Sequence, residues 1–282
     1  MPELPEVEIT ARRLSSALVG AEIESAVATG INTVKTFSPP LDALVGRECD
    51  GVSRVGKLLV VEFGDLSLLI HLMSAGRLQV FDKRASLRDK TSRILIRLTD
   101  GRELRLREFG SKQQAWVKLL DADSVTEDQS VASLGPEAWP TLSEGEFAAV
   151  LSHKHQLHTL LRDQKIIAGI GRTWANEILW TAQLSPFQLA SDLDLEAAER
   201  LRVACGDVLG KALDHYETNV GENVPVKLDK PVKVHRLDGE PCPRCGTKLE
   251  GIHFKDYVIV YCPTDQTGGR LLKDRRMSKL LK

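Results

Sequence analysis

Three cysteines and an aspartate in the last fifth of the chain have the types and spacing of a metal site. Cys242 and Cys245 form a Cys-x-x-Cys knuckle, whose short turn lets two thiolates hold one tetrahedral ion. Cys262 and Asp265 follow after an alternating stretch that predicts a hairpin returning the chain to the knuckle. We expect one structural zinc ion here. Because a carboxylate is an unusual ligand in structural zinc sites, a weak three-thiolate site and a metal-free hairpin are the alternatives.

The N-terminus offers a nucleophile of another kind. Met1 precedes a small residue, so its removal is expected, and Pro2 would then carry a free secondary amine. Free α-amino groups titrate at about 7.7–8.0, which leaves part of them neutral and nucleophilic at physiological pH. Glu3 beside it has the chemistry of a general acid or base. Proline and glutamate are equally favourable at the start of a helix, so the residues alone leave both interpretations open.

The other cysteines and the histidines give weaker signals. Cys49 and Cys205 have no partner at metal-ligand spacing and are expected in the core. Spacings of two and three residues do not place His153, His155 and His158 on one helix face. We therefore expect surface or phosphate-contacting histidines rather than a second metal site.

Composition narrows the class of protein. The chain has 282 residues, 42% hydrophobic and 27% charged, which is ordinary for a globular protein of about two domains and excludes collagen, coiled coil and disorder. No apolar run approaches the roughly 18 residues of a membrane span, and the acidic opening is unlike a signal peptide. Five unevenly placed cysteines do not make a disulfide framework. We expect a cytoplasmic protein that does not bind membranes.

The net charge of −1 hides a segregation along the chain. Residues 126–226 carry 7 basic and 15 acidic side chains, a difference of −8, whereas residues 227–282 carry 13 and 7, a difference of +6. Basic charge concentrated in one small module is typical of contact with a polyanion. A solvated lysine-rich tail is the alternative.

The elements that position these residues follow from periodicity. Apolar residues at helical spacing predict a helix before Gly20, with the prolines at its entry. Alternating runs between about 21 and 120 predict an antiparallel sandwich or barrel of about eight strands, with turns at Gly64-Asp65 and Asp100-Gly101. Further helices are expected near 143–151, 153–163, 172–182 and 194–214. A glycine-containing connection, Ala168-Gly169-Ile170-Gly171, suggests a helix–two-turn–helix arrangement.

Four short sequence motifs follow one another along the chain. They are the opening Pro2-Glu3-Leu4-Pro5-Glu6-Val7-Glu8, the turn Arg54-Val55-Gly56-Lys57, the run from Asp163-Gln164 through Gly169 and Gly171 to Glu177, and the closing Gly239-Glu240-Pro241-Cys242. Together they resemble the formamidopyrimidine-DNA glycosylase/endonuclease VIII family of base-excision repair enzymes, over essentially the whole chain.

The resemblance implies an α+β multidomain protein. Residues 1–122 would form an N-terminal catalytic β-sandwich with a leading helix, and residues 123–140 a linker. Residues 141–226 would form a helix–two-turn–helix DNA-binding domain, and residues 227–282 a zinc-finger-like β-hairpin with a basic tail.

The resemblance also implies an activity: a monomeric DNA glycosylase and abasic-site lyase that acts on damaged double-stranded DNA without a diffusible cofactor. After the nucleotide is flipped out, the Pro2 amine would attack the sugar C1′ and form a Schiff base, with Glu3 protonating the ring oxygen. Glu6 and Lys57 match the carboxylate and the lysine that support this site. Gly169 and Gly171 would let a helix start approach a phosphate.

Several positions depart from the family pattern. The residues expected to contact DNA are His71, Met73, His158, Gly169, Gly171, Arg172, Lys255 and Tyr257. Of these, Arg172 stands where the family usually has asparagine, His158 where it has lysine, and Tyr257 where the finger has an arginine, with Lys255 nearby. The family fills the void left by the flipped nucleotide with a wedge of a methionine, an arginine and a phenylalanine. Here Met73 lies one position before the usual methionine, and Arg107-Glu108-Phe109-Gly110 has no clear arginine–arginine–phenylalanine signature.

These departures leave a second class open. A non-catalytic protein that binds damaged DNA or abasic sites is the alternative, against which the intact Pro2-Glu3 pair argues. A metal-dependent nuclease fits less well, because no cluster of acidic residues suggests a magnesium site. The tail 266–282 could contact DNA through Arg275 and Arg276 or pack against a domain.

Overall fold

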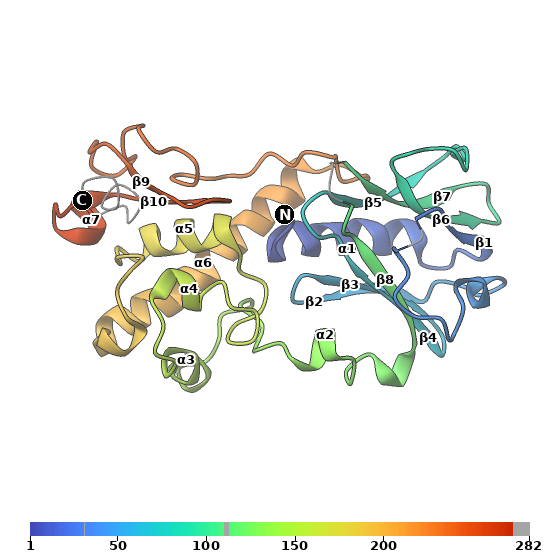
Figure 1. Cartoon of the computed structure of the whole chain (residues 1–282), viewed down its shortest axis with the longest axis horizontal. Helices are drawn as coiled ribbons and strands as arrows, with labels where there is room; N and C mark the ends of the chain where they lie inside the picture. Colours follow the sequence, from blue (N-terminus) through green and yellow to red (C-terminus); the bar gives the residue numbers. More distant parts are fainter. Residues whose placement is uncertain (31, 110–112, 273–282) are drawn as a thin grey trace. The chain divides into compact units, whose positions relative to one another are not determined.

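The computed structural model describes residues 1–30, 32–109 and 113–272. They belong to two compact units (Figure 1). The first consists of Met1–Ser133 and Leu213–Asp229, and the second of Leu134–Ala212 and the chain from Lys230 onward. The expected residues Arg275 and Arg276 lie outside the described part of the chain.

The first unit is a β-sandwich preceded by helix α1 (Leu4–Leu18). Its two antiparallel sheets have the orders β1-β6-β7-β5 and β2-β3-β4-β8. The strands are β1 (Ile23–Ala28), β2 (Gly51–Val55), β3 (Leu58–Phe63), β4 (Leu66–His71), β5 (Gly76–Phe81), β6 (Ser92–Leu98), β7 (Glu103–Glu108) and β8 (Trp116–Asp121). The expectation of a sandwich with about eight strands is confirmed for the described residues.

Alternation and turn chemistry explain these strands. One apolar side chain in two from each sheet enters a shared core, as the period of two in a strand requires. Gly64 and Gly101 take φ angles of 67° and 96° between antiparallel partners, a backbone conformation that glycine adopts at little cost. Both expected hairpin turns are therefore confirmed.

Helix α1 completes the sandwich core and is tied to the edge strand β2. Val7, Ala11 and Leu14 are buried in the same cluster as the strands. On its polar side, Glu8 accepts a hydrogen bond of 2.8 Å from Nε of Arg54, which is itself nearly buried. The helix that carries the N-terminus is thus held to the strand that leads into Lys57.

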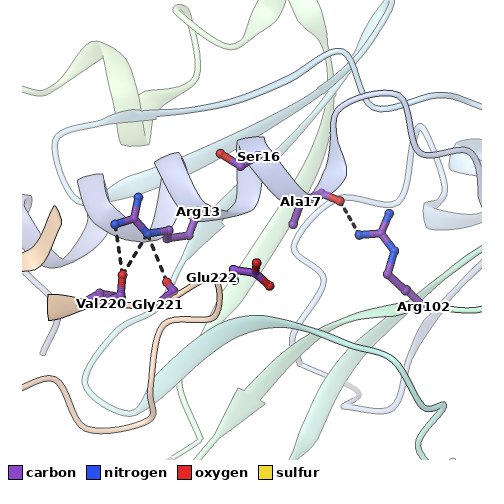
Figure 2. Close-up of a pocket in the computed structure, with 7 residues that line it drawn as sticks. All are labelled: Arg13, Ser16, Ala17, Arg102, Val220, Gly221 and Glu222. Atoms are coloured by element: carbon purple, nitrogen blue, oxygen red, sulfur yellow. Dashed lines mark hydrogen bonds between the residues drawn. The ribbon is translucent and has the colours of Figure 1, made fainter. Parts of the chain in front are cut away.

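A stretch from the C-terminal half of the chain also packs on α1. Arg13 donates to the carbonyl oxygens of Val220 and Gly221, as Figure 2 shows, and Arg102 donates to the carbonyl of Ala17. These groups line a cavity of about 570 Å³. Its guanidinium groups are already bonded to carbonyls, so this cavity provides no ready anion site.

The second unit is mainly helical and ends in a small hairpin. Its elements are α3 (Glu144–Leu151), α4 (Leu157–Leu160), α5 (Arg172–Thr181), α6 (Leu195–Asn219, which belongs to the first unit from Leu213 on), β9 (Glu250–His253), β10 (Val258–Tyr261) and α7 (Pro263–Thr267). Between the sandwich and α3 lies one short helix, α2 (Gln129–Ala132). The expected helices near 143–151, 172–182 and 194–214 are confirmed.

The helix expected over 153–163 is wrong in its first half. The N–H of Leu157 donates to the carbonyl of Gln188, and that of Ala190 donates to His155. Residues 155–157 therefore pair with a distant segment, and only Leu157–Leu160 are helical. Tertiary pairing overrides the local helical spacing here.

Among the described residues, no helix is both long enough and apolar enough to cross a lipid bilayer.

Candidate functional site

The N-terminal segment enters α1 through a buried capping box. Glu3 is the N-cap and Glu6 the third helical residue, and both side chains are buried although they are acidic. The backbone N–H of Glu3 donates to Oε2 of Glu6 at 2.7 Å. Helix capping and a catalytic role are therefore not exclusive readings, because the same hydrogen bond that starts the helix holds the peptide group next to Pro2.

Tyr216 is a partner of this box that the sequence did not reveal. Its hydroxyl donates to Oε1 of Glu6 at 2.8 Å from the last turn of α6. Burial, followed by the negative charge of Glu6, raises the pKa of Tyr216, so the phenol stays protonated. The two residues are 210 positions apart, and no local pattern links them.

Lys57 lies in the tight turn between β2 and β3, where Gly56 has a φ of 56°. Its side chain is buried, with 7% of the residue exposed. The neighbouring His71 pairs with Leu58 across the sheet, and burial together with the charge of Lys57 lowers the pKa of His71 to about 4. His71 is thus neutral at physiological pH, and its Nδ1 accepts the N–H of Met73 at 2.9 Å.

The two expected wedge segments have distinct conformations. Met73 has a φ of +49°, a left-handed conformation that is uncommon for a residue with a side chain. Glu108 is buried and accepts the N–H groups of Gln114 and Ala115 at 2.6 and 2.9 Å. This carboxylate therefore anchors the chain that follows residues 110–112, which are not described, and does not point outward as a wedge.

In the second unit, Gln164 shapes the glycine-containing connection before α5. Its side-chain oxygen accepts the N–H of Gly169 at 3.0 Å and its amide donates to the carbonyl of Ile170 at 2.8 Å. Gly169 takes a φ of 101°, and Gly171 is the N-cap of α5. The result is a ten-residue helix that begins without a side-chain cap, an arrangement suited to an anion.

Tyr257 is the centre of an aromatic and cationic cluster beside this helix start. The guanidinium carbons of Arg162 and Arg172 lie 4.5 and 4.6 Å from its ring centroid. The rings of Phe254 and His158 stack on it at 4.5 and 6.1 Å. No carboxylate of the described residues forms an ion pair with either arginine, which leaves two cations oriented by an aromatic ring.

His158 is not the surface histidine that we expected. It is only 2% exposed, and its Nε2 has no hydrogen-bond partner among the described residues. Burial, followed by the positive charge of Arg162, lowers its pKa to about 3. His158 thus places a neutral ring where the family usually has a lysine. His153 and His155, in contrast, are exposed as expected. Sequence reasoning missed Arg162, whose partner Tyr257 is distant along the chain.

Lys255 lies exposed in the turn between β9 and β10, close in sequence to this cluster. The carbonyl of its neighbour Asp256 accepts a hydrogen bond of 2.7 Å from Arg172. The finger hairpin and the start of α5 are thereby joined.

The four expected metal ligands lie together. The donor atoms of Cys242, Cys245, Cys262 and Asp265 lie within 4.8 Å of one another. The Sγ atoms of Cys245 and Cys262 are 3.5 Å apart, and Sγ of Cys242 is 3.8 Å from Oδ2 of Asp265. Ligands 2.0–2.3 Å from a tetrahedral zinc ion are separated by about 3.3–3.8 Å, so this cluster fits a structural zinc ion.

The surroundings of the cluster fit an anionic ligand set. Arg244 donates to Oδ2 of Asp265 at 3.0 Å, and the indole N–H of Trp180 donates to Sγ of Cys242 at 3.4 Å. The expected hairpin is confirmed, since β9 and β10 pair in antiparallel fashion between the two halves of the site. Cys49 and Cys205 are buried core residues as expected, and burial raises their pKa values to about 11 and 12.

Comparison with known proteins agrees with this arrangement. Three family models match in order: the formamidopyrimidine-DNA glycosylase N-terminal domain at residues 1–111, its H2TH domain at 134–223, and the zinc finger found in FPG and IleRS at 239–268. Formamidopyrimidine-DNA glycosylases of Geobacter sulfurreducens and Herpetosiphon aurantiacus are 31% and 32% identical. Each alignment covers 94% of this chain and 100% of the relative.

Solved structures give the same result. The Lactococcus lactis Fpg in complex with abasic-site DNA has a TM-score of 0.83 at 26% identity, covering 94% of this chain and 99% of that one. MutM in complex with DNA containing carbocyclic 8-oxo-G has a TM-score of 0.82 at 27% identity, covering 94% and 100%. With three domain models matched in order and relatives above 30% identity over nearly its whole length, the chain belongs to the formamidopyrimidine-DNA glycosylase family.

Proposed function

We propose that this chain excises a damaged base from double-stranded DNA and then cleaves the abasic site by β-elimination. The observation that carries the proposal is the N-terminal Pro2-Glu3 pair, held at the start of α1 by the buried carboxylate of Glu6. The structural relatives in complex with abasic-site and 8-oxo-G DNA support the choice of substrate class.

The chemistry starts once Met1 has been removed. The neutral Pro2 nitrogen attacks C1′ of the flipped-out nucleotide, the bond from C1′ to the base breaks, and Glu3 donates a proton to the ring oxygen as the sugar opens. The resulting iminium acidifies the C2′ proton. Loss of that proton expels the 3′ phosphate, and hydrolysis of the iminium returns the Pro2 amine.

Lys57 and Glu6 are assigned supporting roles in these steps. The buried Lys57 supplies positive charge toward a phosphate and assists proton transfer, and His71 beside it stays neutral. Glu6 orients the N-terminal peptide. Met73, in its left-handed conformation, is the candidate for filling space left by the flipped nucleotide.

Backbone phosphates are the proposed ligands of the second unit. Gly169 and Gly171 let the start of α5 approach one phosphate, and Arg172 provides a cation there. We add Arg162 to this set, because it lies on the same Tyr257 ring and forms no ion pair with a carboxylate of the residues that the structure describes. His158 then acts by packing against Tyr257 and not as a cationic contact, and the exposed Lys255 is a further candidate.

The remaining roles follow from this function. Cys242, Cys245, Cys262 and Asp265 hold a zinc ion that stabilises the finger hairpin, and zinc supplies no catalytic chemistry in this scheme. We assign the enzyme to the cytoplasm, at the nucleoid, where its substrate would be, and expect it to act as a monomer.

A non-catalytic binder of damaged DNA remains the second candidate. Glu108 favours it, since its carboxylate accepts two backbone N–H groups and the residue lies within the segment 107–110, which lacks the wedge signature.

Borohydride trapping separates the two candidates. The protein is incubated with a duplex containing one abasic site, and borohydride reduces any Schiff base to a stable adduct. We expect an adduct from the wild type and little from Pro2→Gly, with Met1 removal verified by mass in both. Tight, salt-sensitive binding of the same duplex without an adduct would establish the binder and reject the enzyme.

A further inference from the structure

A continuous hydrogen-bonded chain leads from α6 to the N-terminal peptide within the first unit. Tyr216 is fully buried, and its hydroxyl donates to Oε1 of Glu6 at 2.8 Å. The other oxygen of that carboxylate accepts the N–H of Glu3 at 2.7 Å. This N–H belongs to the peptide bond formed with the carbonyl of Pro2, so the chain ends at a nitrogen two covalent bonds from the Cα that carries the Pro2 amine.

The α6 end of this chain is fixed by other contacts. Glu217, the next residue, forms ion pairs of 2.7 and 2.8 Å with Arg12 and Arg13 of α1. Arg13 also donates to the carbonyl of Glu217 at 3.0 Å and to that of Val220. Tyr216 therefore has little freedom to move relative to α1, and its hydroxyl reaches Glu6 from a defined direction.

The charge state of the pair suits a fixed donor and acceptor. Burial and the Glu6 carboxylate raise the pKa of Tyr216, so the phenol keeps its proton over the whole working range of pH. A carboxylate with a donor on each oxygen has its plane defined, since rotation would break both bonds. Removing the phenol hydroxyl takes away the donor on Oε1 and leaves the Glu3 N–H on Oε2.

We propose that Tyr216 is a positioning residue for the Pro2 amine and acts through the carboxylate of Glu6. The inference rests on the proposed function, because the amine is useful only if it forms the Schiff base. Tyr216 touches neither substrate nor reacting atom in this scheme. It sets the orientation of the peptide that presents the nucleophile, and a nucleophile displaced by about 1 Å loses up to roughly 100-fold in rate.

Tyr216→Phe tests the proposal, with Thr10→Val as the matched control. Thr10 is also buried, and its hydroxyl donates to the backbone carbonyl of the same Glu6 at 2.7 Å, so its removal leaves the carboxylate untouched. Trapping on an abasic-site duplex is followed in single turnover at saturating enzyme. We expect Tyr216→Phe to slow the trapping rate constant by roughly 10- to 100-fold, and Thr10→Val to leave it within about twofold.

Binding measurements distinguish positioning from a general loss of structure. The dissociation constant for the abasic duplex should stay near the wild-type value in Tyr216→Phe. Partial unfolding would lower the apparent affinity, whereas at saturating enzyme it would leave the rate constant of the folded fraction unchanged. A slow rate constant with normal affinity supports the proposal, and a normal rate constant overturns it.

A double-mutant cycle tests whether Tyr216 acts through Glu6. Glu6→Ala and the double variant Glu6→Ala/Tyr216→Phe should trap at the same rate, because the first change has already removed the oxygen that accepts the Tyr216 hydroxyl. If the double variant instead shows the product of the two single reductions in trapping rate, Tyr216 does not act through Glu6. Failure of the wild type to trap at all rejects the proposed function itself, while a trapping wild type with an unaffected Tyr216→Phe rejects only this inference.

Discussion

At the scale of single residues, the structure assigns side chains to roles that their type alone does not indicate. Glu108 anchors two backbone N–H groups, and His158 is a neutral ring within a cationic cluster. The family resemblance places His158 among the residues expected to contact DNA and Glu108 in a segment compared with the void-filling wedge. Their internal roles depend on neighbours whose positions are set by tertiary packing, and sequence spacing therefore could not reveal them.

The buried histidines should make stability depend on mild acid. The folded-state pKa of His158 is lowered to about 3, against an ordinary value of about 6.5. Between these values the unfolded chain binds more protons than the folded one. The contribution of neutral His158 to the free energy of unfolding is therefore complete above pH about 6.5 and is lost as the pH falls toward 3. Within that window one such histidine lowers the free energy of unfolding by up to about 1.4 kcal/mol for each pH unit of acidification. His71 adds a similar loss down to about pH 4.

Urea unfolding at pH 7 and pH 5 checks this expectation. The wild type should lose stability between the two conditions, and His158→Gln should lose less, because glutamine has no proton to gain. His155→Gln is the control, since His155 is exposed. Equal losses in the wild type and His158→Gln would show that His158 does not titrate as a buried neutral group.

At the scale of elements, period and turn chemistry predicted most of what the structure contains. The strands alternate, their turns contain glycine, and α5 begins after Gly171 as the sequence indicates. The segment 155–157 does not follow this rule, because the carbonyl of His155 and the N–H of Leu157 bond to residues 190 and 188, and helical bonding starts only with the carbonyls of Gln156 and Leu157. Helical spacing describes only local preference, and the competing partner lies some 30 residues away in the chain.

Two glycines in α6 should respond oppositely to alanine. A Cβ at Gly206 would lie 1.8 Å from Oγ1 of Thr141, whereas at Gly210 it would meet Nε1 of Trp139 at 3.6 Å, an ordinary contact. We expect Gly206→Ala to destabilise the protein by about 1–3 kcal/mol through overpacking. Gly210→Ala should be neutral or stabilise by up to about 1 kcal/mol through helix propensity.

Denaturant unfolding of both variants measures the difference, with Thr141→Ala/Gly206→Ala as a partial rescue, since alanine lacks the clashing Oγ1 and the methyl group of threonine. Similar midpoints for the two single variants would show that α6 does not pack against Thr141 as described.

The finger hairpin should hold its metal less firmly than a site with four thiolates. Asp265 presents a hard oxygen to a zinc ion that three soft thiolates also bind. Asp265→Cys should slow transfer of zinc to a competing chelator by roughly tenfold, and Asp265→Ala should accelerate it. Asp256→Cys, which adds a thiol in the exposed turn of the same hairpin, is the control.

Zinc content by elemental analysis and chelator absorbance give the readouts, independent of any activity. Less than about a tenth of an equivalent of zinc in purified wild-type protein would contradict the metal site, since a structural site of this type is essential to the fold it supports.

At the scale of the whole molecule, the net charge of −1 makes general attraction to DNA weak, so binding must come from local groups of cations. Arg162 and Arg172 are such a group: both lie on Tyr257, and neither is neutralised by a carboxylate of the described residues. Arg200 makes a contrast, because it is exposed on α6 and already paired with Glu196 at 2.8 Å. Removing the charge of Arg162 should therefore weaken DNA binding more than removing the equal charge of Arg200.

Salt titrations of DNA binding measure that inequality. Each phosphate neutralised by the protein contributes about −0.9 to the slope of log K against log salt on B-form DNA. Arg162→Gln should make the slope less steep by about 0.9 and weaken binding at low salt, while Arg200→Gln should leave the slope unchanged. An unchanged slope for Arg162→Gln would remove Arg162 from the phosphate contacts. Equal changes for both arginines would instead mean that the protein attracts DNA through its total charge, and that the cluster around Tyr257 has only a packing role.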